Sequence, residues 1–82
     1  MQPENGTVVI SKAGKDKGLS FAVLQCDGLY CQIANGKLRP IERPKRKKLR
    51  HLQLTNMKLT EQDMATNRAL RKALTGLSNS DK

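Results

Sequence analysis

Two dipeptides, Asp27-Gly28 and Asn35-Gly36, constrain the fold of this 82-residue chain more than any other feature. Two-residue type I′ hairpin turns need positive φ at both central positions, and Asp-Gly and Asn-Gly are pairs that tolerate it. Because only a short run of residues separates the two dipeptides, they predict two consecutive hairpins. The central part of the chain is therefore expected to be an antiparallel sheet.

The two turns also predict which residues face each other, because directly opposite residues lie on the same face of a sheet. One face is then apolar and the other polar. The apolar face holds Leu24, Cys26, Leu29, Cys31, Ile33 and Leu38, and the polar face holds Gln25, Tyr30, Gln32 and Arg39. The expected pairs are Cys26 with Leu29, Leu24 with Cys31, Ala34 with Lys37 and Ile33 with Leu38.

Further strands are expected before and after the two hairpins. Thr7–Ile10 is β-branched throughout and is followed by a polar stretch with two glycines, Ser11–Gly18, which predicts a strand and a loop. Leu19–Cys26 resumes as a strand, and another is expected at about Leu49–Leu54. Five short strands are typical of a small closed barrel. The fold class is therefore predicted to be mainly β.

A helix is predicted after the last strand. Thr60 and Asp63 have the spacing of the N-cap and N3 residues in a capping box, and Gly76 marks the expected end. We favour a helix that docks on the barrel over a helix that forms a separate binding surface, and the second role stays open. Its apolar stripe holds Leu70, Ala73, Leu74 and Leu77.

The expected organisation is a disordered lead-in (1–5), a barrel (6–55) with a basic loop (43–50), a linker (55–58), a helix (60–76) and a disordered tail (77–82).

Positive charge is concentrated in one segment. Lys37–His51 holds eight of the sixteen Lys and Arg residues but one of the seven acids, and the formal net charge is +9. Such an excess of positive charge predicts a polyanionic partner. Nucleic acid and an anionic membrane surface are both partners of this kind. Pro40 and Pro44 cannot donate to a sheet ladder, so the run Lys45–Lys48 is expected to be an exposed loop.

A membrane partner is disfavoured. The longest apolar run, Phe21–Leu24, is far shorter than the roughly 20 residues of a membrane-spanning helix, and the N-terminus has no apolar signal segment. The basic run also lacks an adjacent apolar helical face. The chain is therefore predicted to be soluble and cytoplasmic.

The segment Gly6–Gly18 resembles the KOW motif of ribosomal proteins and transcription elongation factors. Asn35–Pro40 and Pro44–Leu52 extend the similarity to small bacterial KOW-domain RNA-binding proteins, which are akin to certain archaeal and eukaryotic large-subunit ribosomal proteins. The resemblance covers Gly6–Thr55. It implies an SH3-like barrel whose loops contact RNA, with ribosomal RNA or the large subunit as partner, and no catalytic activity.

The residue types suggest how RNA would be held. Glycines in the first loop let its backbone approach a phosphate, and Arg side chains form forked hydrogen bonds to phosphate that Lys cannot. With few rings for stacking, recognition is expected to rest on RNA shape and backbone. The predicted RNA-binding residues are Lys12, Lys15, Lys17, Lys37, Arg39, Arg43, Lys45, Arg46, Lys47, Lys48, Arg50 and His51, with Gly14 and Gly18 as the loop glycines.

Other roles for these residues carry less weight. Structural zinc takes four ligands, and Cys26, Cys31 and His51 supply three, so no metal is expected. In the predicted register the two cysteines are diagonal, with Cα atoms about 7 to 8 Å apart, which predicts buried thiols without a disulfide. No residues with catalytic spacing are found, so no enzyme activity, cofactor or small-molecule substrate is predicted.

Three functions stay open. An RNA-binding protein associated with the ribosome and translation is favoured, and the chain is expected to be a monomer. A protein interaction adaptor in transcription is the second, because KOW-type barrels also occur in elongation factors. Non-specific binding of nucleic acid, including duplex DNA, is the third. A basic run that serves only as a solvated face would need none of these partners.

Overall fold

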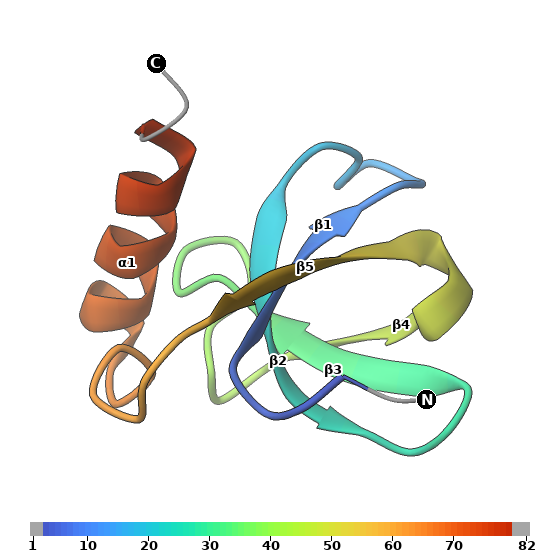
Figure 1. Cartoon of the computed structure of the whole chain (residues 1–82), viewed down its shortest axis with the longest axis horizontal. Helices are drawn as coiled ribbons and strands as arrows, with labels where there is room; N and C mark the ends of the chain where they lie inside the picture. Colours follow the sequence, from blue (N-terminus) through green and yellow to red (C-terminus); the bar gives the residue numbers. More distant parts are fainter. Residues whose placement is uncertain (1–2, 80–82) are drawn as a thin grey trace.

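One five-stranded antiparallel sheet and one helix make up the fold (Figure 1). This computed structural model describes residues 3–79. The sheet has the order β4-β3-β2-β1-β5, and within the described residues β4 and β5 do not pair, so the sheet is not closed. The predicted class, mainly β with a C-terminal helix, is confirmed. The elements are β1 (Thr7–Ser11), β2 (Ser20–Cys26), β3 (Tyr30–Ala34), β4 (Lys45–Lys48), the 3₁₀ helix η1 (Leu49–His51), β5 (Leu52–Lys58) and α1 (Asn67–Asn79).

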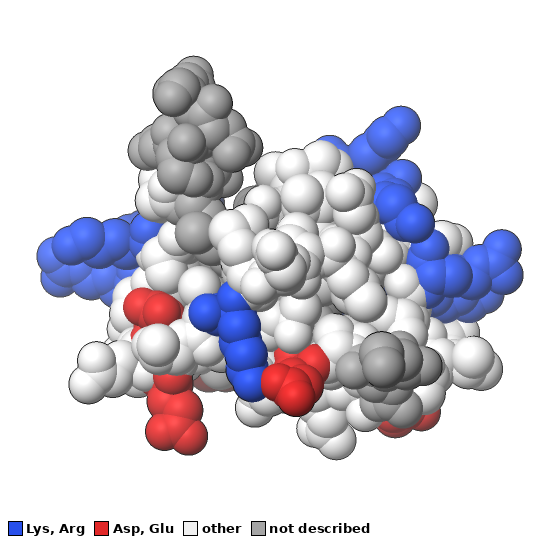
Figure 2. Space-filling model, in the orientation of Figure 1, with Lys and Arg blue, Asp and Glu red and all other residues white. Residues whose placement is uncertain are grey.

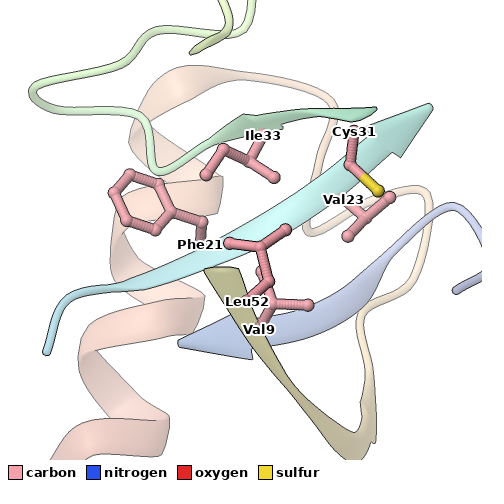
Figure 3. Packing of buried hydrophobic residues seen from close by; sticks show 6 residues of the cluster. All are labelled: Val9, Phe21, Val23, Cys31, Ile33 and Leu52. Carbon is pink, nitrogen blue, oxygen red and sulfur yellow. The ribbon is translucent and has the colours of Figure 1, made fainter. Parts of the chain in front are cut away.

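Two apolar clusters hold the fold together, one on each face of the sheet. The alternation of side chains along β2 shows this division: Phe21 and Val23 point into one cluster and Ala22 into the other, and all three are fully buried. The first cluster lies within the curve of the sheet and contains Val9, Phe21, Val23, Cys31, Ile33 and Leu52 (Figure 3). The second contains Val8, Ala22, Ala34, Leu70 and Leu74.

The first turn lies one residue later than predicted. The Asp27 N–H donates to the Tyr30 carbonyl (2.9 Å), and the Tyr30 N–H donates to the Asp27 carboxylate (3.2 Å). Gly28 thus occupies the first central position of the turn, with φ of 103°, and Asp27 needs no positive φ. Asp27 therefore precedes the two central residues of the turn, and its side chain stabilises the turn by accepting the Tyr30 N–H.

This shift changes the partners of both cysteines. Cys26 lies opposite Cys31, not Leu29, and the two form a disulfide with Cα atoms 4.0 Å apart. The prediction of unbridged thiols is wrong because it rested on the diagonal register. Leu29, predicted to lie on the apolar face, stands in the turn and is 76% exposed.

The second turn is wider than the predicted two residues. The Asn35 side-chain oxygen accepts the N–H groups of Lys37 and Arg39, each at 3.0 Å, and the Asn35 N–H donates to the Arg39 carbonyl (2.9 Å). The chain therefore leaves the sheet after Ala34 and does not return at once. The predicted pairs of Ala34 with Lys37 and Ile33 with Leu38 are wrong, and Leu38 is 60% exposed.

The basic run forms strand β4, so its prediction as an exposed loop is wrong. Lys45 lies opposite Ile33 and Lys47 opposite Cys31, which makes the run the partner of β3 at one edge of the sheet. Pro44 lies just before the first residue of the strand, so its missing N–H removes no ladder hydrogen bond from β4. Charged side chains, Lys above all, are well suited to an edge strand because they discourage pairing with other chains.

The segment after β5 begins differently from the prediction. The contacts expected of a capping box form, with the Thr60 N–H donating to Asp63 (3.1 Å) and the Asp63 N–H donating to Thr60 Oγ1 (3.2 Å). They stabilise only a turn, and the predicted linker 55–58 belongs to β5. Helix α1 starts at Asn67, where Thr66 Oγ1 accepts the Ala69 N–H (3.1 Å).

Helix α1 docks on the sheet, as favoured from the sequence. Leu70 and Leu74 are buried in the second cluster, and Ala73 is half-buried. Gly76 does not end the helix, which continues to Asn79. Residues 77–79 of the predicted disordered tail are therefore helical, and residues 80–82 lie outside the described part of the chain.

The start of the chain contacts strand β5 through Glu4. Glu4 forms an ion pair with Lys58 of β5, and its carbonyl accepts the Thr7 N–H (3.0 Å). Glu4 of the predicted lead-in thus contacts the sheet, and Met1 and Gln2 lie outside the described residues.

Candidate nucleic-acid interface

Three segments that carry predicted RNA-binding residues meet at one end of the sheet. They are the β1–β2 loop (residues 12–18), strand β4 and the 3₁₀ helix η1. The Lys12 N–H donates to the His51 carbonyl (2.8 Å), which joins the start of the loop to η1. Lys47 Nζ donates to the Ala13 carbonyl (2.7 Å), which joins the loop to β4. We call these three segments the β-edge surface.

A buried carboxylate lies beneath this surface. Asp16 is 6% exposed, and its Oδ2 atom lies 3.1 Å from Lys45 Nζ in an ion pair. Burial acts to raise the pKa of Asp16, but the contact with Lys45 and the nearby charges of Arg39 and Lys47 outweigh it. The pKa therefore lies below its ordinary value, and Asp16 stays ionised at neutral pH.

The cations of the β-edge surface fall into two groups because strand neighbours point to opposite faces. Lys45 and Lys47 point inward, and their ammonium groups bind Asp16 and the Ala13 carbonyl. These two lysines hold the surface together. Their strand neighbours and the loop cations are exposed, and among the described residues none of them forms an ion pair; they are Lys12, Lys15, Lys17, Arg46, Lys48 and Arg50.

The exposed cations gather on a limited part of the molecule. Figure 2 shows blue side chains at the right, over the region where Figure 1 places the β1–β2 connection and the corner between β4 and β5. A separate blue group lies at the left, over α1. Between the two groups Figure 2 shows mostly white surface, with blue and red side chains next to each other near the lower centre and further red ones along the lower edge.

The two loop glycines adopt a left-handed backbone conformation. Gly14 has φ of 79° and Gly18 has φ of 90°, values that other residues rarely adopt. At Gly18 an added Cβ would meet nothing within 4 Å, whereas at Gly14 it would approach Lys47 Nζ at 3.5 Å. The loop is therefore open at Gly18 and closely backed by β4 at Gly14.

Tyr30 and its neighbours form the side of the surface next to the first hairpin. The guanidinium carbon of Arg46 lies 3.8 Å from the centre of the Tyr30 ring, a cation–π contact that holds the arginine in place. Beyond Tyr30 lies a surface hollow whose apolar wall includes Leu29 and Leu49, with Lys48 and Arg50 at its border. Apolar surface and positive charge thus adjoin here.

Three predicted residues lie in the β3–β4 connection. Lys37 and Arg43 are exposed there, while Arg39 is half-buried and acts on Asp16 through its charge. The connection also contacts the start of α1, because the Ile41 N–H donates to the Asn67 side chain (2.7 Å). The structure therefore brings Arg39 toward the β-edge surface, whereas within residues 3–79 neither Lys37 nor Arg43 forms a hydrogen bond or ion pair with that surface.

The cysteines and His51 do not assemble as ligands. Cys26 and Cys31 are joined in the disulfide, which leaves no thiolate for a metal. His51 is half-buried in η1, where its carbonyl accepts the Lys12 N–H. Within residues 3–79, no group of three His, Cys, Asp or Glu residues is placed to hold a metal ion.

One basic cluster was missing from the sequence prediction. Arg68, Arg71 and Lys72 are exposed on α1 and line a shallow hollow together with Thr75 and Gly76. Their spacing of three and four residues, which places side chains on one helical face, was the signal available in the sequence. It was masked by the denser run at Lys45–Lys48.

Comparison with known proteins adds no family. No protein-family model matches the chain, and no curated protein matches it. The similarity to KOW-domain proteins therefore rests on the residues quoted for it. Across residues 3–79, no helix is both long enough and apolar enough to cross a bilayer.

Proposed function

We propose that this protein is a non-catalytic RNA-binding protein of the KOW type, with an SH3-like barrel whose β-edge surface contacts the phosphate backbone. The observation that carries the proposal is the attachment of the cationic β1–β2 loop to β4 and η1 through Lys12, Lys45 and Lys47. A fixed array of exposed cations loses little conformational entropy on binding, which favours a polyanion.

The chemistry of the surface favours RNA with a defined shape. The exposed cations stand on a curved edge of the sheet, so they match a folded backbone better than an extended strand. Arg46 and Arg50 supply planar groups that can form forked hydrogen bonds with phosphate, and the lysines supply compact charge. The hollow beside Leu29 and Leu49 offers apolar surface on which an unpaired base can rest.

The partner we propose is structured ribosomal RNA, met on the large subunit by a cytoplasmic monomer. The support is the similarity of Gly6–Gly18 and Pro44–Leu52 to KOW-domain ribosomal proteins. Disulfides are rare in reducing compartments, so the disulfide between Cys26 and Cys31 does not support a cytoplasmic location. The location therefore rests on the proposed partner.

The proposal is tested by measuring the affinity for a structured RNA fragment across a range of salt concentrations. The variant Lys12→Gln/Lys15→Gln/Lys17→Gln removes three exposed loop charges that have no partner in the described residues. We expect the magnitude of the slope of log K against log salt to fall by about 2 to 3, at about 0.7 to 0.9 per lost phosphate contact.

The matched control is Lys37→Gln/Arg43→Gln, which removes exposed charge from the β3–β4 connection. It should change the slope by less than the loop variant does. Equal slopes in the wild type and the loop variant would exclude the β-edge surface. Sedimentation with RNA polymerase and not with the large subunit would favour the transcription adaptor instead.

A further inference from the structure

Helix α1 carries a second concentration of positive charge that the β-edge surface does not explain. Arg68, Arg71 and Lys72 are exposed, and none forms an ion pair with any described residue. Arg71 is three residues from Arg68 and Lys72 is four, so all three lie on the same helical face. In Figure 2 the blue group over α1 is on the opposite side of the molecule from the β-edge surface.

The position of these cations is unfavourable for the helix itself. Arg68 lies in the first turn, near the positive end of the helix dipole, and that turn contains no acidic residue of its own, although the Glu42 carboxylate accepts a hydrogen bond from the Asn67 side chain (2.6 Å) there. Like charges at spacings of three and four residues also repel each other. Helix stability therefore does not account for this cluster, whereas a bound anion would relieve both unfavourable effects.

Gly76 adds an independent observation on the same face. Glycine within a helix is less favourable than alanine, and an added Cβ at Gly76 would meet nothing within 4 Å in the described structure. Packing inside the protein thus does not require glycine here. Without a side chain, the strip beside Arg71, Lys72 and Thr75 stays open, so an elongated partner can approach the helix closely.

The opposite face of α1 limits what the partner can be. Leu70 and Leu74 are buried against the sheet, so the side chains described on this helix leave no large apolar group free to insert into a bilayer. A membrane surface is therefore a poor fit. A phosphate backbone fits the exposed cations, which are spread over about 6 Å of helix at 1.5 Å per residue.

We propose that the face formed by Arg68, Arg71, Lys72, Thr75 and Gly76 is a second site for RNA phosphates. One molecule would then join two RNA segments, one on α1 and one on the β-edge surface. The joining role rests on the proposed function, but phosphate binding by α1 does not.

The experiment is a two-step capture. Protein is bound to an immobilised RNA hairpin, free protein is washed away, and a second, labelled hairpin is added. The test variant is Arg68→Gln/Arg71→Gln/Lys72→Gln, which keeps good helix formers at exposed positions. We expect capture of the second hairpin to fall at least tenfold, while affinity for one hairpin at limiting protein falls less than threefold.

Two controls keep the result specific. Arg68→Lys/Arg71→Lys keeps the charge and should retain capture. Poly-glutamate should compete with the second hairpin far less than RNA does. Unchanged capture in the test variant, capture that depends on a protein dimer detected by sedimentation, or equal competition by poly-glutamate would overturn the second site.

A separate measurement distinguishes this proposal from the proposed function. The loop variant Lys12→Gln/Lys15→Gln/Lys17→Gln should keep salt-sensitive RNA binding through α1, and adding the three helix substitutions should abolish it. Binding that survives all six substitutions would overturn the α1 site. Binding lost with the helix substitutions but unaffected by the loop substitutions would support α1 and contradict the β-edge surface.

Discussion

The two basic regions of the molecule use their charges differently. In strand β4 the inward-pointing lysines bind groups of the protein itself, Lys45 at Asp16 and Lys47 at the Ala13 carbonyl. On α1, Arg68, Arg71 and Lys72 have no ion-pair partner in the described residues. The denser run in the sequence is thus partly structural, and the sparser cluster is entirely exposed. Charge density along a sequence does not measure the charge available to a partner.

The difference also extends to how each region is attached. Strand β4 is held by the ladder with β3 and by its own lysines. Helix α1 is held by apolar packing and by the hydrogen bond from the Ile41 N–H to the Asn67 side chain, and Gly36 lies close against its first turn. Substitutions at the two attachments should therefore have different consequences.

The largest effect is expected for Gly36→Ala. At φ of 78° an added Cβ would lie 2.3 Å from the Asn67 carbonyl oxygen, so α1 would have to move. The backbone strain and the clash together should cost about 3 kcal/mol of unfolding free energy. Urea unfolding, followed by circular dichroism, measures this loss.

Gly18→Ala is the matched control for this substitution. Gly18 also has positive φ (90°), but an added Cβ would meet nothing within 4 Å. Only the backbone cost of about 1 kcal/mol should remain. Equal losses at the two positions would mean that contact with Gly36 does not hold α1 in place.

A smaller effect is expected for Lys47→Met, which tests the structural role of β4. The side chain is 8% exposed, so methionine keeps its apolar length but loses the hydrogen bond to the Ala13 carbonyl. The part-buried Ala13 carbonyl keeps the hydrogen bond that Ser11 Oγ donates (3.0 Å), so losing only the charged bond from Lys47 should cost about 1.5 kcal/mol. Thermal unfolding measures the change.

The neighbouring substitution Lys48→Met gives the comparison. Lys48 is exposed on the same strand, so this substitution should change the unfolding free energy of the protein by less than about 0.5 kcal/mol. RNA affinity should respond in the opposite order, with Lys48→Met weakening binding through lost charge. A stability loss at Lys48 as large as that at Lys47 would contradict the division of β4 into inward and outward cations.

The smallest effect is expected for Asp16→Asn, and it depends on pH. Because the folded-state pKa of Asp16 lies below its ordinary value, the ionised group stabilises the fold at pH values above the unfolded pKa. That contribution is lost as pH falls through the folded pKa. The variant should lose about 1 kcal/mol at pH 7 and show a flatter fall in stability below about pH 4.

Asp16→Asn also changes the balance of charge at the β-edge surface. Lys45 loses its ion-pair partner, so the surface gains positive charge and RNA affinity at low salt should rise. If the unfolding free energies of the wild type and the variant fell equally with decreasing pH, the stabilising role of Asp16 would be contradicted. Unfolding curves at pH 3, 5 and 7 make this comparison.

Part of the fold was predictable because it depends on neighbours in sequence. The glycines at 28 and 36 adopt positive φ as turn residues do, and Thr7–Ile10 forms a strand as a β-branched run favours. The spacing of Leu70 and Leu74 identified the buried stripe of the helix. At the site, the loop that carries the exposed lysines 12, 15 and 17 followed from the same local signals.

The sequence by itself determined the mainly β class, the places where the chain turns and the amphipathic character of α1, because each follows from local backbone preference. Only the tertiary structure decided the hairpin registers and the pairing of Lys45–Lys48 with β3. It also brought Asp16 to Lys45, 29 positions away in the chain, and Gly36 to Asn67. These depend on which distant backbone and side-chain groups find partners in the folded state, and local preference contains no information about that choice.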